Sequence, residues 1–302
     1  MQSHLEAGSQ VVHTAAGPVE YARSGSGPVI LGLHGTPGGY DQTQLLFQEF
    51  TRHGFTLVAP SRPGYLRTPL STGRTYMEQA DAMIALLDTL AIDRVLLAAV
   101  SGGGPVALQI ALRHPDRVSA LLLECAVTRR YVLNLTRSNR LAFSFLLSHP
   151  GNWLLNVMGH YWPGLIVRGV IHKAHERDGA LARSMFRHVM AHAGKVQGVK
   201  DWLRTLSPLA LRKVGLENDL EQLAGIGSWP LEQITAPTLI VHGTRDAEVP
   251  YGDAEFLAGR LARAELVCVP EGLHLLFFSE QWTALRGAEL DFLRRHAPGL
   301  SA

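Results

Sequence analysis

Short apolar runs recur along the chain and alternate with longer stretches of helical spacing. The apolar runs lie near residue 20 and at 29–35, 56–61, 94–101, 119–127, 238–243 and 265–270. Continuous runs of this length are typical of strands buried on both faces, as in a parallel sheet. Apolar residues three and four apart predict helices at 75–90, 105–112 and 251–261. The alternation predicts an α/β fold with a mostly parallel, doubly wound sheet.

This alternation stops in the middle of the chain. Between about residues 129 and 230 no strand-like run occurs, and the spacing is helical. The segment contains 14 basic and 6 acidic residues, a net charge of +8, which leaves −6 for the rest. Pro230 and Pro237 bracket the return to strands, and proline ends helices. The pattern predicts a core domain of residues 1–128 and 231–302 and an inserted helical cap of residues 129–230.

Length and composition narrow the class of protein. The 302 residues are 46% hydrophobic, which is enough for a large core and excludes a mainly disordered chain. A formal net charge of +2 gives no indication of nucleic-acid binding. The first ten residues lack the features of a secretory signal, and no apolar run approaches the roughly 20 residues of a membrane helix. We therefore expect a cytoplasmic protein that binds neither nucleic acid nor a membrane.

Both cysteines lie in apolar runs. Cys125 and Cys268 are spaced too far apart for a metal-binding motif and are too few for a disulfide framework. Such residues behave as small buried hydrophobes. We expect two buried thiols, in keeping with a reducing compartment.

A serine directly follows one predicted strand and precedes a predicted helix. Residues 94–105 read RVLLAAVSGGGP, with Ser101 at the turn. So sharp a turn strains the serine backbone and requires small residues two before and two after it, here Ala99 and Gly103. The segment resembles the nucleophile elbow of the α/β-hydrolase family, with Ala in place of the usual first Gly. A phosphate-binding helix start is the alternative, but G-x-G-x-x-G and a following Lys are both missing.

A second family motif follows an earlier strand. Residues 34–39 read HGTPGG and resemble the H-G-x-P-G loop of the family. The resemblance implies that the backbone N–H groups of Thr36 and Gly102 form an oxyanion hole, which acyl transfer needs. An ordinary tight turn is the alternative. Residues 61–65, SRPGY, resemble a family loop near the site entrance and support the fold rather than the chemistry.

The family pattern also singles out an acid and a base late in the chain. A serine nucleophile needs a histidine to take its proton and a carboxylate to orient that histidine. In the family the order is nucleophile, acid, histidine, with the last two on loops after late strands. The resemblance therefore implies Asp246, in the loop of LIVHGTRDAEVP, as the acid and His274, at the end of LVCVPEGLH, as the base.

Three glutamates compete with Asp246 for the role of the acid. Glu248 lies two residues after Asp246, Glu271 is closer in sequence to His274, and Glu124 lies inside a predicted strand. Glu271 fits a charge on a surface loop, and a side chain within a strand is poorly placed. Asp246 is therefore preferred, with Glu248 left as the nearest alternative.

Other histidines have spacings that suggest a metal site. His172 and His175, and likewise His188 and His192, could place two imidazoles on one helix face. Neither pair contains the Glu of H-E-x-x-H, and no third ligand is evident. We therefore expect no metal and no cofactor.

Two histidines at strand ends have a different expected role. His34 and His242 each directly precede a glycine where a predicted strand ends. We expect both to anchor their loops by hydrogen bonds.

The resemblance implies serine chemistry on an acyl group. Family members that are dehalogenases or epoxide hydrolases have Asp at the elbow, so Ser101 argues against both. We expect a carboxylic ester hydrolase that forms a covalent acyl-enzyme and acts on a small, apolar ester. A C–C bond hydrolase, an acyltransferase, a proline-iminopeptidase-like peptidase and a hydrolase-like sensor of small ligands remain alternatives. The iminopeptidase group usually has Trp where this chain has Gly102. The oligomeric state is not predicted.

The predicted cap contains candidate residues for the wall of a substrate pocket. They are large and apolar or aromatic: Phe143, Phe145, Leu146, Trp153, Leu154, Met158, Tyr161 and Trp162. Each could instead belong to the cap's own core.

Overall fold

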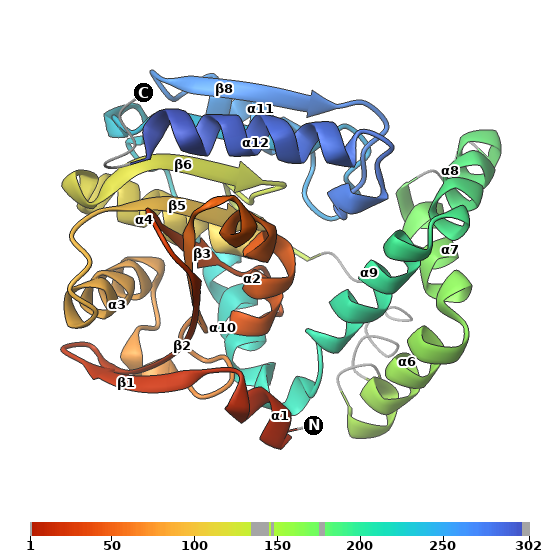
Figure 1. The fold of residues 1–302 in the computed structure, drawn as a ribbon, viewed down its shortest axis with the longest axis horizontal. Coiled ribbons are helices and arrows are strands. Elements are labelled where there is room, and N and C mark those ends of the chain that lie inside the picture. The colour runs from red at the N-terminus through yellow and green to blue at the C-terminus, as the bar shows by residue number, and fades with distance from the viewer. Residues whose placement is uncertain (1, 134–144, 146–147, 175–178, 298–302) are drawn as a thin grey trace.

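One sheet organises the molecule (Figure 1). The computed structural model describes residues 2–133, 145, 148–174 and 179–297. Within them, eight strands form a sheet of order β1-β2-β4-β3-β5-β6-β7-β8. The strands are β1 (Gln10–Thr14), β2 (Gly17–Gly25), β3 (Val29–Leu33), β4 (Thr56–Pro60), β5 (Val95–Val100), β6 (Val118–Glu124), β7 (Thr238–Gly243) and β8 (Ala264–Val269). All pairs from β4 to β8 are parallel, and only β1–β2 and β2–β4 are antiparallel.

Helices cover both faces of this sheet, which confirms the predicted fold class. The α-helices of the described residues are α1 (Gln2–Ala7), α2 (Tyr40–Phe47), α3 (Tyr76–Thr89), α4 (Gly104–Arg113), α6 (His149–Tyr161), α7 (Pro163–Ala174), α8 (Gly179–Ala191), α9 (Ala193–Arg204), α10 (Lys213–Ala224), α11 (Gly252–Ala258) and α12 (Trp282–His296). In β5, Leu97 and Ala99 pack in one core cluster with α3 and α4, whereas Leu96 and Ala98 pack in another with α2 and α12. The apolar run of β5 is uninterrupted because its side chains pack into the core on both faces of the sheet.

At the two edges of the sheet the hydrophobic pattern misses one strand, β1, and overstates the burial of the other, β8. β1 lies at one edge and is mostly exposed, so it has no apolar run to reveal it. β8 lies at the other edge, and Val269 is the one residue of this strand that is buried. Cys125 is buried as predicted, but the prediction for Cys268 is wrong because this residue is exposed. An edge strand can be apolar without having both faces covered.

All the secondary-structure elements that the structure describes in the predicted cap region are helices. The helices α6 to α9 stand together at the end of the sheet toward which β5 and β6 point (Figure 1). They form a hydrophobic cluster of their own with Leu273, Leu275 and Phe278 from the chain after β8. In contrast, Leu223 of α10 packs in the core of the sheet. The division of the chain at residues 129 and 230 stays a prediction.

Among the described residues, no helix is long and apolar enough to cross a membrane.

A buried charge cluster joins α12 to the end of β6. The Arg286 guanidinium donates to Glu124 Oε1 at 2.8 Å and to Glu289 Oε2 at 2.6 Å. None of the three side chains is more than 5% exposed. Burial and the nearby Glu124 carboxylate raise the pKa of Glu289 to about 8, against the opposing charge of Arg286. The folded protein therefore favours the protonated form of Glu289 next to the Arg286–Glu124 ion pair.

This cluster should make the folding stability depend on pH. The folded pKa of Glu289, about 8, lies above its ordinary value of 4.5, so the folded state binds the extra proton between those values. The stability contributed by that proton is complete below pH 4.5, falls as the pH rises toward about 8 and is lost above it. Glu289→Gln, which cannot titrate, should flatten this fall when urea unfolding is measured from pH 5 to pH 9.

Asp291→Asn is the matched control for this experiment, because Asp291 lies on the same helix with its side chain 76% exposed. Its free energy of unfolding should follow the wild-type pH dependence. If Glu289→Gln also keeps the wild-type pH dependence, the assignment of a protonated Glu289 is wrong.

Candidate active site

Ser101 lies at the turn between β5 and α4. Its φ of 52° is in the left-handed region, which is costly for a residue with a side chain. A Cβ on Gly103 would lie 2.7 Å from His34 O and 2.8 Å from Leu33 O, so this position has no room for a side chain. The small residue expected two positions after the serine is therefore required by the close approach of the β3 loop.

The loop after β3 packs directly against this turn. A Cβ on Gly35 would lie 3.1 Å from Ser101 Cβ, and a Cβ on Gly102 would collide with Thr36 Oγ1. The Gly35 N–H is already used, because it donates to Gln42 Oε1 at 2.9 Å. In the part of the chain that the structure describes, no protein acceptor is found for the N–H of Thr36 or Gly102. These two predicted donors lie next to each other and next to Ser101.

Asp246 and His274 are also brought together. His274 Nδ1 donates to Asp246 Oδ2 at 2.7 Å. The other carboxylate oxygen, Oδ1, accepts the backbone N–H groups of Glu248 and Val249, each at 2.8 Å. The loop after β7 therefore fixes the carboxylate, and the carboxylate fixes the imidazole with the proton on Nδ1. This leaves Nε2 of His274 as the nitrogen that can accept a proton.

The protonation states follow from this pairing. Burial alone would raise the pKa of Asp246, but the charge of His274 and hydrogen bonds from His242, His274 and Val249 hold it well below its ordinary value. Burial alone would lower the pKa of His274, but the Asp246 carboxylate raises it above its ordinary value of 6.5. The pairing therefore favours a charged Asp246 carboxylate and makes His274 a stronger base than a free imidazole.

The competing glutamates have other partners. Glu248 forms an ion pair with Lys173 at 2.6 Å, and Glu271 forms one with Arg245 at 3.0 Å. Glu124 is held by Arg286 at 2.8 Å. Asp246 is thus the carboxylate that the structure places in hydrogen-bond contact with the His274 ring.

The hydrogen bonds expected of the two strand-end histidines are present. His34 Nε2 accepts the N–H of Arg62 at 2.9 Å. His242 Nε2 donates to Val249 O at 2.9 Å and also lies 3.2 Å from Asp246 Oδ2. His242 thus supports the carboxylate as well as the loop, a role that the sequence does not reveal because the contact spans an irregular turn.

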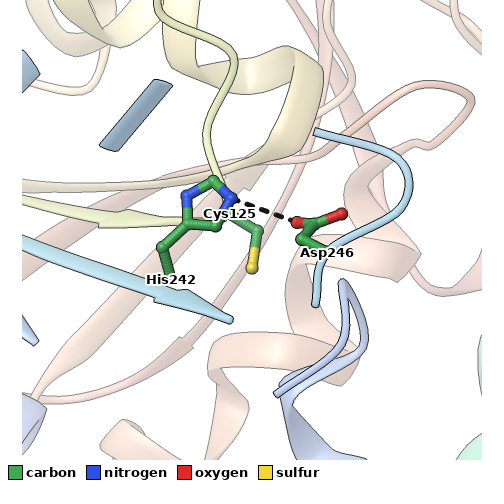
Figure 2. A group of neighbouring side chains, drawn as sticks. All are labelled: Cys125, His242 and Asp246. Atoms are coloured by element: carbon green, nitrogen blue, oxygen red, sulfur yellow. Dashed lines mark ion pairs between the residues drawn. The ribbon is translucent and has the colours of Figure 1, made fainter. Parts of the chain in front are cut away.

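Cys125, His242 and Asp246 form a buried cluster with the composition of a metal site (Figure 2). Their ligand atoms lie within 4.8 Å of one another. Burial raises the pKa of the Cys125 thiol, so the sulfur is protonated and a poor ligand. The His242 nitrogen next to Asp246 is the one that donates to Val249, and both Asp246 oxygens accept hydrogen bonds. This donor set fits a hydrogen-bond network better than a metal site.

The described histidines of the two pairs noted in the sequence are not members of this cluster. His188 and His192 have ring centres 4.4 Å apart, and His188 Nδ1 lies 3.5 Å from Glu280 Oε1. His172 is exposed on α7, and His175 lies outside the described residues.

Ser101, His274, Thr36 and Gly102 all line one cavity of about 340 Å³. Its other walls are largely apolar and come from α7, α9, α10 and the segment after β8; they include Val170, Trp202, Leu206, Leu216, Leu220 and Phe277. A larger hollow of about 830 Å³ between α1, α2 and α9 contains none of the predicted site residues.

None of the candidate wall residues in the described part of the predicted cap lines this cavity. Phe145, Trp153, Leu154, Met158, Tyr161 and Trp162 are absent from the cavity lining. Trp153, Tyr161 and Trp162 are 67%, 67% and 58% exposed, so they do not belong to the cap's own core either. Phe143 and Leu146 lie outside the described residues. Sequence spacing shows that a helix has an apolar stripe but not which neighbour covers it.

Known proteins match this chain over most of its length. A family model for the alpha/beta hydrolase fold matches residues 28–158. The solved alpha/beta hydrolase fold protein from Nakamurella multipartita is 34% identical, with a TM-score of 0.84, covering 93% of this chain and 98% of its own. An uncharacterized hydrolase of Bacillus subtilis (strain 168) is 25% identical, covering 92% of this chain and 95% of the relative. A pimeloyl-[acyl-carrier protein] methyl ester esterase of Chromobacterium violaceum is 28% identical, covering 91% and 95%. The chain therefore belongs to the alpha/beta hydrolase fold family.

Proposed function

We propose that the protein is a serine hydrolase that acts on carboxylic esters, with Ser101, His274 and Asp246 as its catalytic triad. The observation that carries this proposal is the 2.7 Å bond from His274 Nδ1 to a buried Asp246, with His274 and Ser101 facing the same cavity. The strained φ of Ser101 supports it, because such strain persists where it holds a functional group in place.

The proposed reaction has two stages. Ser101 Oγ attacks the ester carbonyl while His274 Nε2 takes its proton, and the resulting oxyanion accepts the N–H groups of Thr36 and Gly102. His274 then protonates the leaving alcohol, and an acyl-enzyme on Ser101 remains. Water, deprotonated by His274, attacks this acyl group; the bond from the acyl carbon to Ser101 Oγ then breaks, His274 returns the proton to Ser101 Oγ, and the acid is released. Every proton passes through one imidazole, so the proposed chemistry needs no cofactor.

The walls of the cavity support a small, largely apolar substrate. Leucines of α10 and Trp202 of α9 lie opposite the loops that carry the triad. The helical region between β6 and β7 therefore acts as a cap that shapes the pocket. The methyl ester esterase among the relatives supports an ester as the substrate.

A panel of p-nitrophenyl esters tests this proposal. We expect multiple turnovers with an optimum at a short to medium acyl chain, because a cavity of about 340 Å³ limits chain length. Each methylene that fits should improve kcat/KM by a factor corresponding to about 1 kcal/mol or more. Addition of a chelator should leave the rate unchanged, because the proposed oxyanion donors are backbone N–H groups.

Three outcomes contradict the proposal. Turnover that stops after one equivalent, with a rise in melting temperature on ligand binding, indicates a sensor. Faster cleavage of a vinylogous diketone or of a prolyl amide than of every ester indicates a C–C hydrolase or a peptidase. A rate that falls with chelator and returns with zinc indicates metal chemistry.

A further inference from the structure

A fully buried ion pair lies behind the loop that we assign as the oxyanion hole. Arg62 Nη1 and Nη2 donate to Asp219 Oδ1 and Oδ2 at 2.9 and 2.6 Å, a bidentate pair between the chain after β4 and helix α10. The side chains are 0% and 1% exposed. Tyr65 adds a third donor to the carboxylate at 2.6 Å. Burial and three donors to the carboxylate restrain the pair to this geometry.

Arg62 contacts three consecutive residues of that loop. Its Nε donates to His34 O at 3.1 Å, and its Nη2 donates to Gly35 O at 3.3 Å and to Thr36 Oγ1 at 3.2 Å. The Thr36 hydroxyl in turn donates to Asp219 Oδ2. The ion pair thus holds both the backbone and the side chain of the loop.

His34 completes the restraint on the Gly35 carbonyl. Its Nε2 faces the N–H of Arg62, which can only donate, so Nε2 is the acceptor and Nδ1 carries the proton. Nδ1 lies 2.8 Å from Gly35 O and therefore donates to it. Burial holds the pKa of His34 well below its ordinary value, consistent with this neutral form. Two donors fix one carbonyl oxygen.

That carbonyl belongs to the same peptide unit as the Thr36 N–H. In a trans peptide the C=O and N–H bonds point in opposite directions, so donors that hold Gly35 O behind the loop direct the Thr36 N–H away from them. Hydrogen bonding to the carbonyl also polarises the unit and makes its N–H a stronger donor.

Resting on the proposed function, we propose that Arg62 and Asp219 are positioning residues: together they orient and polarise the Gly35–Thr36 peptide so that its N–H can hold the oxyanion. Neither side chain touches the substrate. Arg62 supplies the donor to the carbonyl, and Asp219 fixes Arg62 and the Thr36 hydroxyl.

Asp219→Asn tests this inference with a trifluoromethyl ketone and the matching secondary alcohol as inhibitors. The ketone adds Ser101 to form an oxyanion, whereas the alcohol occupies the pocket without one. We expect kcat to fall roughly 10- to 100-fold, since loss of a whole oxyanion donor costs about 10²- to 10³-fold. The Ki of the ketone should rise by a similar factor, while KM and the Ki of the alcohol stay within threefold.

Asp253→Asn is the control for the loss of a buried aspartate. Asp253 is 4% exposed and pairs with Arg129 at 2.7 Å, away from the cavity. The Asp253→Asn variant should lower the melting temperature and leave kcat within threefold.

A second variant covers the case in which Asp219→Asn does not fold. Thr36→Val keeps the backbone N–H and removes the hydroxyl that Asp219 holds. This variant should lower kcat about tenfold at unchanged KM.

The inference is wrong if folded Asp219→Asn keeps kcat within threefold of the wild-type value. It is also wrong if the Ki values of the ketone and the alcohol rise equally, which indicates general damage to the pocket. Ser101→Ala separates this failure from that of the proposed function. If Ser101→Ala keeps its esterase activity, the proposed function and this inference both fall. If Ser101→Ala is inactive while Asp219→Asn and Thr36→Val are fully active, the positioning role alone falls.

Discussion

Replacement of Ser101 by alanine should lower kcat for ester hydrolysis by about 10⁴- to 10⁶-fold, the usual cost of losing a triad member. Alanine keeps the Cβ and therefore the backbone strain at φ 52°, so the turn itself should persist. Only the hydroxyl that we propose as the nucleophile is removed. The same variant should no longer react with a fluorophosphonate probe, which labels an activated serine. Initial rates and gel-based labelling of the purified protein measure both effects.

Ser71→Ala is the matched control, because Ser71 is exposed in a short turn before α3. It should keep wild-type rates and labelling. If Ser101→Ala retains more than about a tenth of the wild-type rate, the loss is below about 1.4 kcal/mol of transition-state stabilisation. A loss that small would show that Ser101 is not the nucleophile.

Replacement of Asp246 by asparagine should fold normally and lower kcat by about 10⁴-fold. The amide has almost the same shape, but it removes the charge that stabilises protonated His274 and no longer fixes the proton on Nδ1. The pH dependence should change as well. His274 must be neutral to act as a base, and the Asp246 carboxylate raises its pKa. Loss of that charge should lower the pKa and move the acid limb of kcat/KM to lower pH.

Glu248→Gln serves as the comparison for Asp246→Asn, since Glu248 lies two residues away, half exposed, and pairs with Lys173. It should change kcat by less than tenfold. The opposite ranking of the two variants would identify Glu248 as the acid and would contradict the role assigned to Asp246.

The central strands and the residues at their ends could be predicted from the sequence because burial leaves a direct trace there. β5 is apolar on both faces, and the small residues around Ser101 are demanded by a backbone approach as close as 2.7 Å. Asp246 and His274 were identified from the order of motifs, and the structure brings their side chains to 2.7 Å. The catalytic roles themselves stay predictions until the variants are measured.

What the sequence could not predict depends on contacts between distant segments. Asp219 meets Arg62 across 157 positions, and nothing in the spacing around either residue indicates the other. The motif at residues 61–65 therefore supports only the fold when it is considered alone. The exposed Cys268 fails for a related reason, because an apolar run does not show whether a second layer covers the strand.

The contacts of α10 limit how freely the middle of the chain can be exchanged for that of a relative. Asp219 holds the loop at residues 34–36, and Arg212 donates to Gly38 O at 2.7 Å and pairs with Asp41 at 2.7 Å. A chimera that replaces residues 129–230 as one block would remove both anchors from a core that otherwise keeps its native sequence. Exchange of residues 129–206 alone would leave them in place. A chimera designed to change the specificity should therefore join the two sequences before Arg212, inside the helical region.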